Sequence, residues 1–272
     1  MHLFYKIMRY FLFVLLLILL VGDNQKARGQ QQGGKWVLVF SDEFNQKKDS
    51  RPDTTKWSVP KPQNNIWRRW VSDSPAVAYI SKGKLICKAI PQRGANGAHK
   101  MITGAIDTQD KFSFKYGRVD VRMRTNIQPG NFPAAWLMPQ PDGKPYLYGE
   151  IDIVETFGSK AVAHHTAHTH WDVNLKRKSN NEFHENLDVT KWHVYSVVWE
   201  PEQLTWLVDG KVMGVYRKSS SLQDLKDGQW TFDRPFFIRL NQSVGDNTWK
   251  ERPDYSRTFR TEFDWVRVYQ RK

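Results

Sequence analysis

Cysteine is almost missing from this sequence, whose 272 residues contain only Cys87. A single thiol excludes intramolecular disulfides, so a stable domain must depend on its core. Cys87 lies in the apolar run KLICKAI, where we expect a buried small hydrophobe rather than a reactive nucleophile.

Sustained helical periodicity, internal repeats and long low-complexity linkers are also missing, which argues against helical bundles and repeat arrays. The sequence instead contains many short runs that alternate apolar and polar residues and are rich in Val, Tyr and Trp. Glycine turns separate them, and Asp209-Gly210 within LTWLVDGKVMGVY gives the clearest hairpin. This pattern predicts one all-β sandwich or barrel. The main helical segment is expected around SLQDLKDG, and a curved sheet would offer a concave groove suited to a polymer.

The N-terminal segment has the layout of a secretory signal peptide. Lys6 and Arg9 precede an apolar run over residues 11–21, and small residues follow at Ala27 and Gly29. We expect cleavage after Gly29, a secreted or periplasmic protein and no stable membrane insertion. The expected parts are a signal peptide (1–29), a short segment (30–35) and one domain (36–272). The alternative is an uncleaved membrane anchor.

The chain is basic, with a formal net charge of +13, and it contains 12 tryptophans. A basic surface can bind nucleic acid or an acidic polymer, or simply keep the protein soluble. The positive residues are scattered, which favours solubility. Tryptophan faces stack on nucleobases and on sugar rings, but most of these side chains could equally fill the core.

The segment LYGEIDIVETFG carries three acids, Glu150, Asp152 and Glu155. Side chains alternate along a strand, so Glu150 and Asp152 share a face and Glu155 points to the other. A bulge between Asp152 and Glu155 would return Glu155 to the first face. The glutamate backbones would then be roughly 13 Å apart, at ~3.3 Å per strand residue. Side chains reaching roughly 4 Å each would leave about 5 Å between carboxylates, as a retaining glycosidase requires.

In such an enzyme one carboxylate is ionised and attacks the anomeric carbon, while the other holds a proton for the leaving oxygen. An aspartate between them can hydrogen-bond the attacking group and help to separate the two pKa values. The alternative without any catalytic role is that these acids form the solvent-exposed face of a strand.

LYGEIDIVETFG resembles the active-site strand of glycoside hydrolase family 16, in its bulged E-x-D-x-x-E form found in laminarinase-like and endo-β-galactosidase-like members. VFSDEF, YGRVDVRMRTNIQPGNFPAAWLMP, HVYSVVWEPEQLTWLVDGKVM and EFDWVRVYQ resemble other strands of that family in the expected order. The resemblance implies a concanavalin-like jelly-roll β-sandwich. It makes Glu150 the nucleophile, Asp152 its assisting acid and Glu155 the general acid/base. Trp136 takes the position of a sugar-stacking tryptophan.

The implied activity is endo-acting, retaining hydrolysis of a polysaccharide, without a cofactor. We expect one catalytic domain that acts as a monomer. A β-1,3- or mixed-linkage β-1,3/1,4-glucan is the first expectation. NQSVGDN departs from the commonest glucanase pattern, with Asp246 in place of a glycine. The alternative substrate is therefore a galactan or poly-N-acetyllactosamine glycan cut by an endo-β-1,4-galactosidase. A non-catalytic carbohydrate-binding module is the alternative class, and the acidic strand argues against nucleic acid.

The run HHTAHTHW adds a histidine cluster. His164, His168 and His170 would share one face of a strand, and such a cluster can bind zinc. We prefer no metal, since a carboxylate mechanism is already complete. His168, His170 and Trp171 are expected to line the groove, with Trp249 as a further sugar platform. The alternative is that these are ordinary strand and core residues.

Overall fold

The computed structural model describes residues 34–46, 49–94, 96–248 and 250–272. They fall into two compact units, a large one over Leu38–Gln270 and a small one of residues 34–37 with 271–272. The expected signal peptide (1–29) and Trp249 lie outside the described residues. Among the residues described, no helix combines the length and apolar character needed to cross a membrane.

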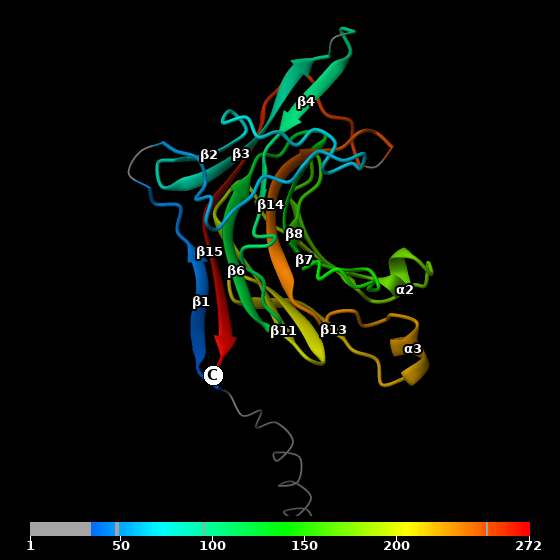
Figure 1. Cartoon of the computed structure of the whole chain (residues 1–272). Helices are drawn as coiled ribbons and strands as arrows, with labels where there is room; N and C mark the ends of the chain where they lie inside the picture. The colour runs from blue at the N-terminus through cyan, green and yellow to red at the C-terminus, as the bar shows by residue number, and fades with distance from the viewer. Residues whose placement is uncertain (1–33, 47–48, 95, 249) are drawn as a thin grey trace, which may run out of the picture. The chain divides into compact units, whose positions relative to one another are not determined.

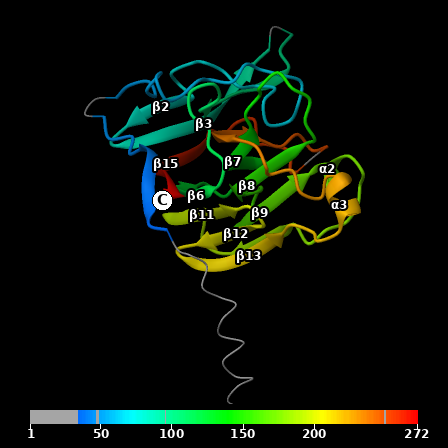
Figure 2. The same ribbon diagram turned by 60° about the horizontal axis from the view of Figure 1, so that its bottom comes forward.

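Two antiparallel sheets make up the large unit (Figures 1 and 2). In the described chain the first has nine strands, with the order β13-β12-β11-β6-β15-β3-β2 and with β1 and β4 as further members. Its strands are β1 (Trp36–Asp42), β2 (Ala78–Ser81), β3 (Lys84–Arg93), β4 (His99–Thr103), β6 (Gly117–Thr125), β11 (His193–Glu200), β12 (Gln203–Val208), β13 (Lys211–Arg217) and β15 (Phe259–Arg271).

The second sheet has six strands in the described chain, in the order β10-β9-β8-β7-β14-β5. They are β5 (Ala105–Asp107), β7 (Asn131–Pro139), β8 (Gly149–Glu155), β9 (Val162–Thr169), β10 (Glu182–Asn186) and β14 (Phe236–Val244). The short helices are α2 (His170–Val173) and α3 (Leu222–Lys226). In Figure 1, β14 is seen to bend along its length. The predicted all-β sandwich is confirmed.

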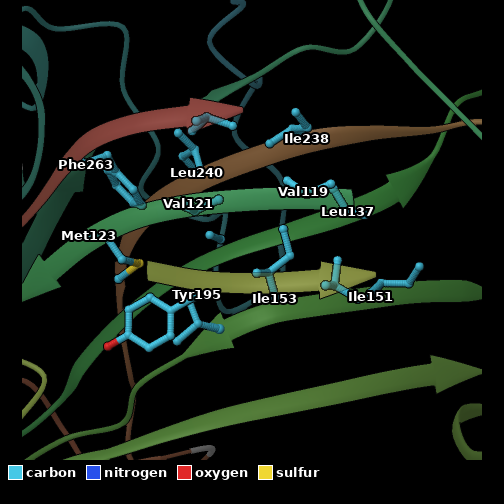
Figure 3. Close-up of a cluster of buried hydrophobic side chains, with 14 of the residues drawn as sticks. Val119, Val121, Met123, Leu137, Ile151, Ile153, Tyr195, Ile238, Leu240 and Phe263 are labelled. Carbon is cyan, nitrogen blue, oxygen red and sulfur yellow. The ribbon is translucent and has the colours of Figure 1, made fainter. Parts of the chain in front are cut away.

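The core lies between the sheets, because each sheet turns alternate apolar side chains toward the other. Figure 3 shows Val121 of β6, Tyr195 of β11 and Ile151 of β8 in one buried cluster. Cys87 is fully buried in the same cluster, and burial raises the pKa of its thiol. The prediction of an inert, buried cysteine is therefore confirmed.

Two local predictions are confirmed and one is wrong. Asp209 (φ 49°) and Gly210 (φ 82°) form the left-handed turn that joins β12 to β13, and α3 lies in SLQDLKDG. However, β9 ends at Thr169, so His170 does not share a strand face with His164 and His168. The reason is a helix start: the backbone N–H and the hydroxyl of Thr169 donate to Asp172 Oδ1 at 2.6 and 2.8 Å, as in a capping box.

The predicted bulge in β8 is present. On the β7 side Trp136 lies opposite Asp152 and Ala135 opposite Val154, so Ile153 is the extra residue. The register against β9 shifts between Asp152 and Glu155. Ile153 and Val154 both enter the core, and Glu155 returns to the face that carries Asp152.

Two side chains bond the backbone carbonyls at this bulge. Trp206, on β12 of the other sheet, donates its indole N–H to the Asp152 carbonyl at 2.8 Å. The His165 Nδ1–H donates to the Ile153 carbonyl at 2.6 Å. Burial lowers the pKa of His165 to about 4, so its ring stays neutral. A buried carbonyl without a partner costs about 1–3 kcal/mol, so these bonds stabilise the bulge.

Candidate active site

The three acids of β8 lie on the face of the six-stranded sheet that points away from the core. Asp152 is buried, and Glu150 and Glu155 are half-buried. The Tyr148 hydroxyl donates to Glu150 Oε2. Burial, followed by the charge of Glu150, raises the pKa of Tyr148, so the phenol remains a proton donor. The strand thus presents a line of acids with a fixed donor beside the first.

The environment favours a proton on two of these acids. Burial, and then the charge of Glu150, raises the pKa of Glu155 to about 8, while the nearby charges of His168 and Lys250 limit the rise. Burial and the charges of Glu155 and Glu150 raise the pKa of Asp152 well above its usual value, and Asp152 hydrogen-bonds Glu150. At neutral pH, Glu155 can therefore give a proton away and Asp152 can donate a hydrogen bond to Glu150.

His168 faces this acid row from β9, where it lies opposite Glu150. Its Nε2 is 3.5 Å from Asp152 Oδ2, and its Nδ1 is 3.0 Å from Asp172 Oδ2. Burial alone would lower the pKa of His168, but the hydrogen bond that its ring donates to Asp172 and the charge of Glu150 outweigh burial and raise the pKa. The acids beside it therefore favour the protonated form of this ring.

Aromatic and charged side chains continue this face across β7 and β14. Trp136 is only 5% exposed, and its Nε1–H donates to Asn241 Oδ1 at 2.7 Å. The Trp67 ring meets it edge-on at 5.0 Å, and the Arg239 guanidinium lies 4.7 Å from the Trp136 ring. Arg239 also pairs with the buried Asp107 at 3.0 Å. Trp136 thus lies beside the acids, within a packed group that leaves little of its surface open.

Beyond Glu155 the same face continues into a hollow of about 760 Å³. His164, opposite Glu155 on β9, hydrogen-bonds Glu182 of β10 at 3.3 Å. The Phe157 ring is tilted against the His164 ring, with 4.8 Å between their centroids. The hollow is lined by Phe157, Gly158, Lys160, Val162, His164, Glu182, His184, Asn186, Lys250 and Glu251. An extended ligand bound on the Glu155 side of the acid row would enter this hollow.

The structure therefore brings Glu150, Asp152, Glu155, His168 and Trp136 to one face. His170 and Trp171 lie instead in α2, where the Trp171 ring packs 4.5 Å from the Arg177 guanidinium.

Sequence reasoning missed two polar contributors. Tyr148 stands two residues before Glu150, which a same-face pattern could have indicated. Asp172 follows His168 by four residues, and its Thr-x-x-Asp spacing is a helix-start signal.

Glu150, Asp152 and His168 each offer a ligand atom within 4.8 Å of the others. Carboxylates must lose their protons to bind a metal, whereas burial and neighbouring negative charge favour a proton on Asp152. A cation bound here would therefore have to displace a proton from Asp152.

Known proteins resemble this chain in sequence and in fold. The family profile described as "Glycosyl hydrolases family 16" matches residues 78–267. The keratan-sulfate endo-1,4-beta-galactosidase of Sphingobacterium multivorum is 29% identical, over 86% of this chain and 55% of that protein. The glucan endo-1,3-beta-glucosidase A1 of Niallia circulans is 33% identical, over 86% of this chain and 38% of that protein. The chain thus spans about half or less of the length of these two relatives.

A solved structure covers nearly the same extent as this chain. The laminarinase from Rhodothermus marinus superimposes with a TM-score of 0.73 and 26% identity, over 88% of this chain and 99% of that one. The sequence match and the shared sandwich agree, and this chain belongs to family 16 of the glycosyl hydrolases.

Proposed function

We propose that this protein is an endo-acting β-glycoside hydrolase that retains the anomeric configuration. One observation carries the proposal: the bulge at Ile153 puts Glu150 and Glu155 on one face, with the pKa of Glu155 raised to about 8. One carboxylate and one carboxylic acid facing the same bond are what double displacement needs.

In the first step the Glu150 carboxylate attacks the anomeric carbon. The glycosidic bond breaks as Glu155 gives its proton to the leaving oxygen, and a glycosyl ester forms on Glu150. Glu155 then takes a proton from water, which attacks the same carbon and frees Glu150. Asp152 and the Tyr148 hydroxyl orient Glu150 by donating hydrogen bonds to it.

The neighbouring side chains have supporting roles. His168, held by Asp172, is placed to contact the sugar at the cleavage point and to adjust the charge around Asp152. Trp136, the proposed sugar-stacking tryptophan, lies opposite Asp152 on β7. His170, Trp171 and Trp249 remain candidates for contacts with more distant sugars.

The first substrate expectation is a β-1,3- or mixed-linkage β-1,3/1,4-glucan, supported by the glucanase and laminarinase relatives. The second is a galactose-containing glycan cut at β-1,4 bonds, supported by the galactosidase relative. Asp246, which replaces a glycine of the common glucanase pattern, pairs with Arg69 at 2.6 Å. This pair lies at the end of β14 and changes the charge there, which keeps the second substrate class open.

The cellular setting follows from the N-terminal sequence. We infer that residues 1–29 are a signal peptide and that the domain over residues 36–272 acts as a monomer outside the cytoplasm, in the medium or the periplasm.

Replacing the proposed nucleophile tests the mechanism. Glu150→Gln keeps the shape of the side chain but removes the attacking charge, so kcat is expected to fall at least about a thousandfold. The melting temperature should stay the same or rise, since one of several neighbouring acids is neutralised. Glu185→Gln, at a half-buried position on β10 where Glu185 lies 3.9 Å from the Lys211 ammonium, is the matched control and should keep full activity. Substantial turnover by Glu150→Gln would remove Glu150 from its role.

The pH profile tests the acid. Glu155 must be protonated in the free enzyme, so kcat/KM is expected to fall as pH rises through about 8. The charge of Lys250 lowers the pKa of Glu155, so Lys250→Met should move this alkaline limb to higher pH. Lys178→Met, at an exposed loop position, should leave it in place. If the alkaline limb has the same pKa in Lys250→Met as in the unchanged protein, Glu155 is not the general acid.

Product profiling tests the substrate. Laminarin, lichenan, agarose and a poly-N-acetyllactosamine glycan are incubated with the enzyme, and the oligosaccharides are identified by mass spectrometry. We expect internal cleavage of laminarin or lichenan. Cleavage of only the last two would overturn the glucan preference, and binding without any cleavage would support a binding module.

A further inference from the structure

The outer face of the nine-stranded sheet carries an excess of positive charge. Along β6 the side chains of Val119, Val121 and Met123 enter the core, so the alternating Arg122 and Arg124 point outward. The strand register sets four residues side by side on this face, namely Tyr79, Ile86, Glu262 and Arg124 on β2, β3, β15 and β6.

Six cations gather around this row, and we call them the lysine–arginine cluster: Lys82, Lys84, Lys88, Arg122, Arg124 and Arg260. Two acidic residues form ion pairs with cations of this cluster. Glu262 is shared by Arg124 at 3.0 Å and Arg260 at 2.8 Å, and Asp264 pairs with Arg122. Six positive and two negative side chains leave a local excess of positive charge.

Two other arginines of this sheet are each paired with one acid. Arg118 pairs with Asp120 at 2.7 Å, and Arg267 pairs with Glu43 at 2.8 Å. The lysine–arginine cluster differs from these one-to-one pairs because its cations outnumber its acids.

Hollows and aromatic rings accompany the charge. Two hollows, of about 420 and 310 Å³, share Arg124, Arg260 and Glu262 in their walls. Tyr79 lies in the wall of the smaller one. The half-buried Trp192 has the Arg124, Arg122 and Lys84 cations within 4.8, 4.9 and 5.9 Å of its ring. Cations next to flat apolar surfaces suit a ligand that has both anionic groups and sugar rings.

We propose that this end of the outer face is a second, non-catalytic site that binds an anionic polysaccharide through its sulfate or carboxylate groups. The sandwich core separates it from the acid row, so the site holds the polymer without competing with the cleavage site. A second attachment point raises the effective concentration of a long chain near the enzyme.

The test uses dextran sulfate, an α-linked polymer unrelated to the proposed substrates, against neutral dextran of the same length. Fluorescence polarisation of labelled polymer with the full chain, at about 0.15 M salt to screen distant charges, gives the Kd. We expect dextran sulfate to bind and neutral dextran not to bind.

Paired variants locate the site. Lys84→Gln with Lys88→Gln should weaken dextran sulfate binding roughly fivefold or more, since two cations next to the polymer are lost. Lys144→Gln with Lys178→Gln, at exposed loop positions, removes the same charge elsewhere and should cost less than about twofold. Equal losses in the two double variants would overturn the proposal, as would equal binding of both dextrans. Tighter binding of a DNA duplex than of dextran sulfate would overturn it in favour of nucleic acid.

Discussion

The one extra residue in β8 is the constraint on which the active face depends. With strict alternation Glu155 would point into the core, where an acid could be neither solvated nor used. The bulge at Ile153 sends two consecutive apolar side chains inward and turns Glu155 outward. The bulge also interrupts the regular backbone hydrogen bonds of the strand. Trp206 and His165 hydrogen-bond the backbone carbonyls of Asp152 and Ile153 there. The face that carries the acids is thus stabilised from behind by two fully buried side chains.

The two sheets differ in the side chains that they carry on their outer faces. The six-stranded sheet carries the row of acids, and burial together with their mutual repulsion raises the pKa values of Asp152 and Glu155. The nine-stranded sheet supplies the other half of the core on its inner face and carries most of its charge on the outer one. Trp206 links the two, since it belongs to β12 but bonds the backbone of β8. A change deep in one sheet can therefore reach the chemistry on the other.

Features written in short stretches of sequence could be predicted. The acid spacing indicated the bulge, Asp209-Gly210 indicated the hairpin, and the apolar surroundings of Cys87 indicated burial. The strand expected through His170 is wrong because the Thr-x-x-Asp helix start at Thr169 ends β9 there. Contacts between residues far apart in the sequence could not be predicted from it. Trp206 lies 54 positions from Asp152, and Arg239 lies 132 positions from Asp107. Only the folded chain brings such partners together.

Kinetics of two tryptophan variants test the central claim most directly. Trp206→Phe removes the indole donor to the Asp152 carbonyl, while Trp199→Phe removes an equally buried donor to the Phe232 carbonyl at 3.2 Å, away from the bulge. Each should lower the unfolding free energy by about 1–3 kcal/mol. With both variants fully folded at the assay temperature, we predict that kcat falls about tenfold or more in Trp206→Phe alone, because a displaced Glu155 donates its proton poorly. Equal kcat values in the two variants would contradict the account.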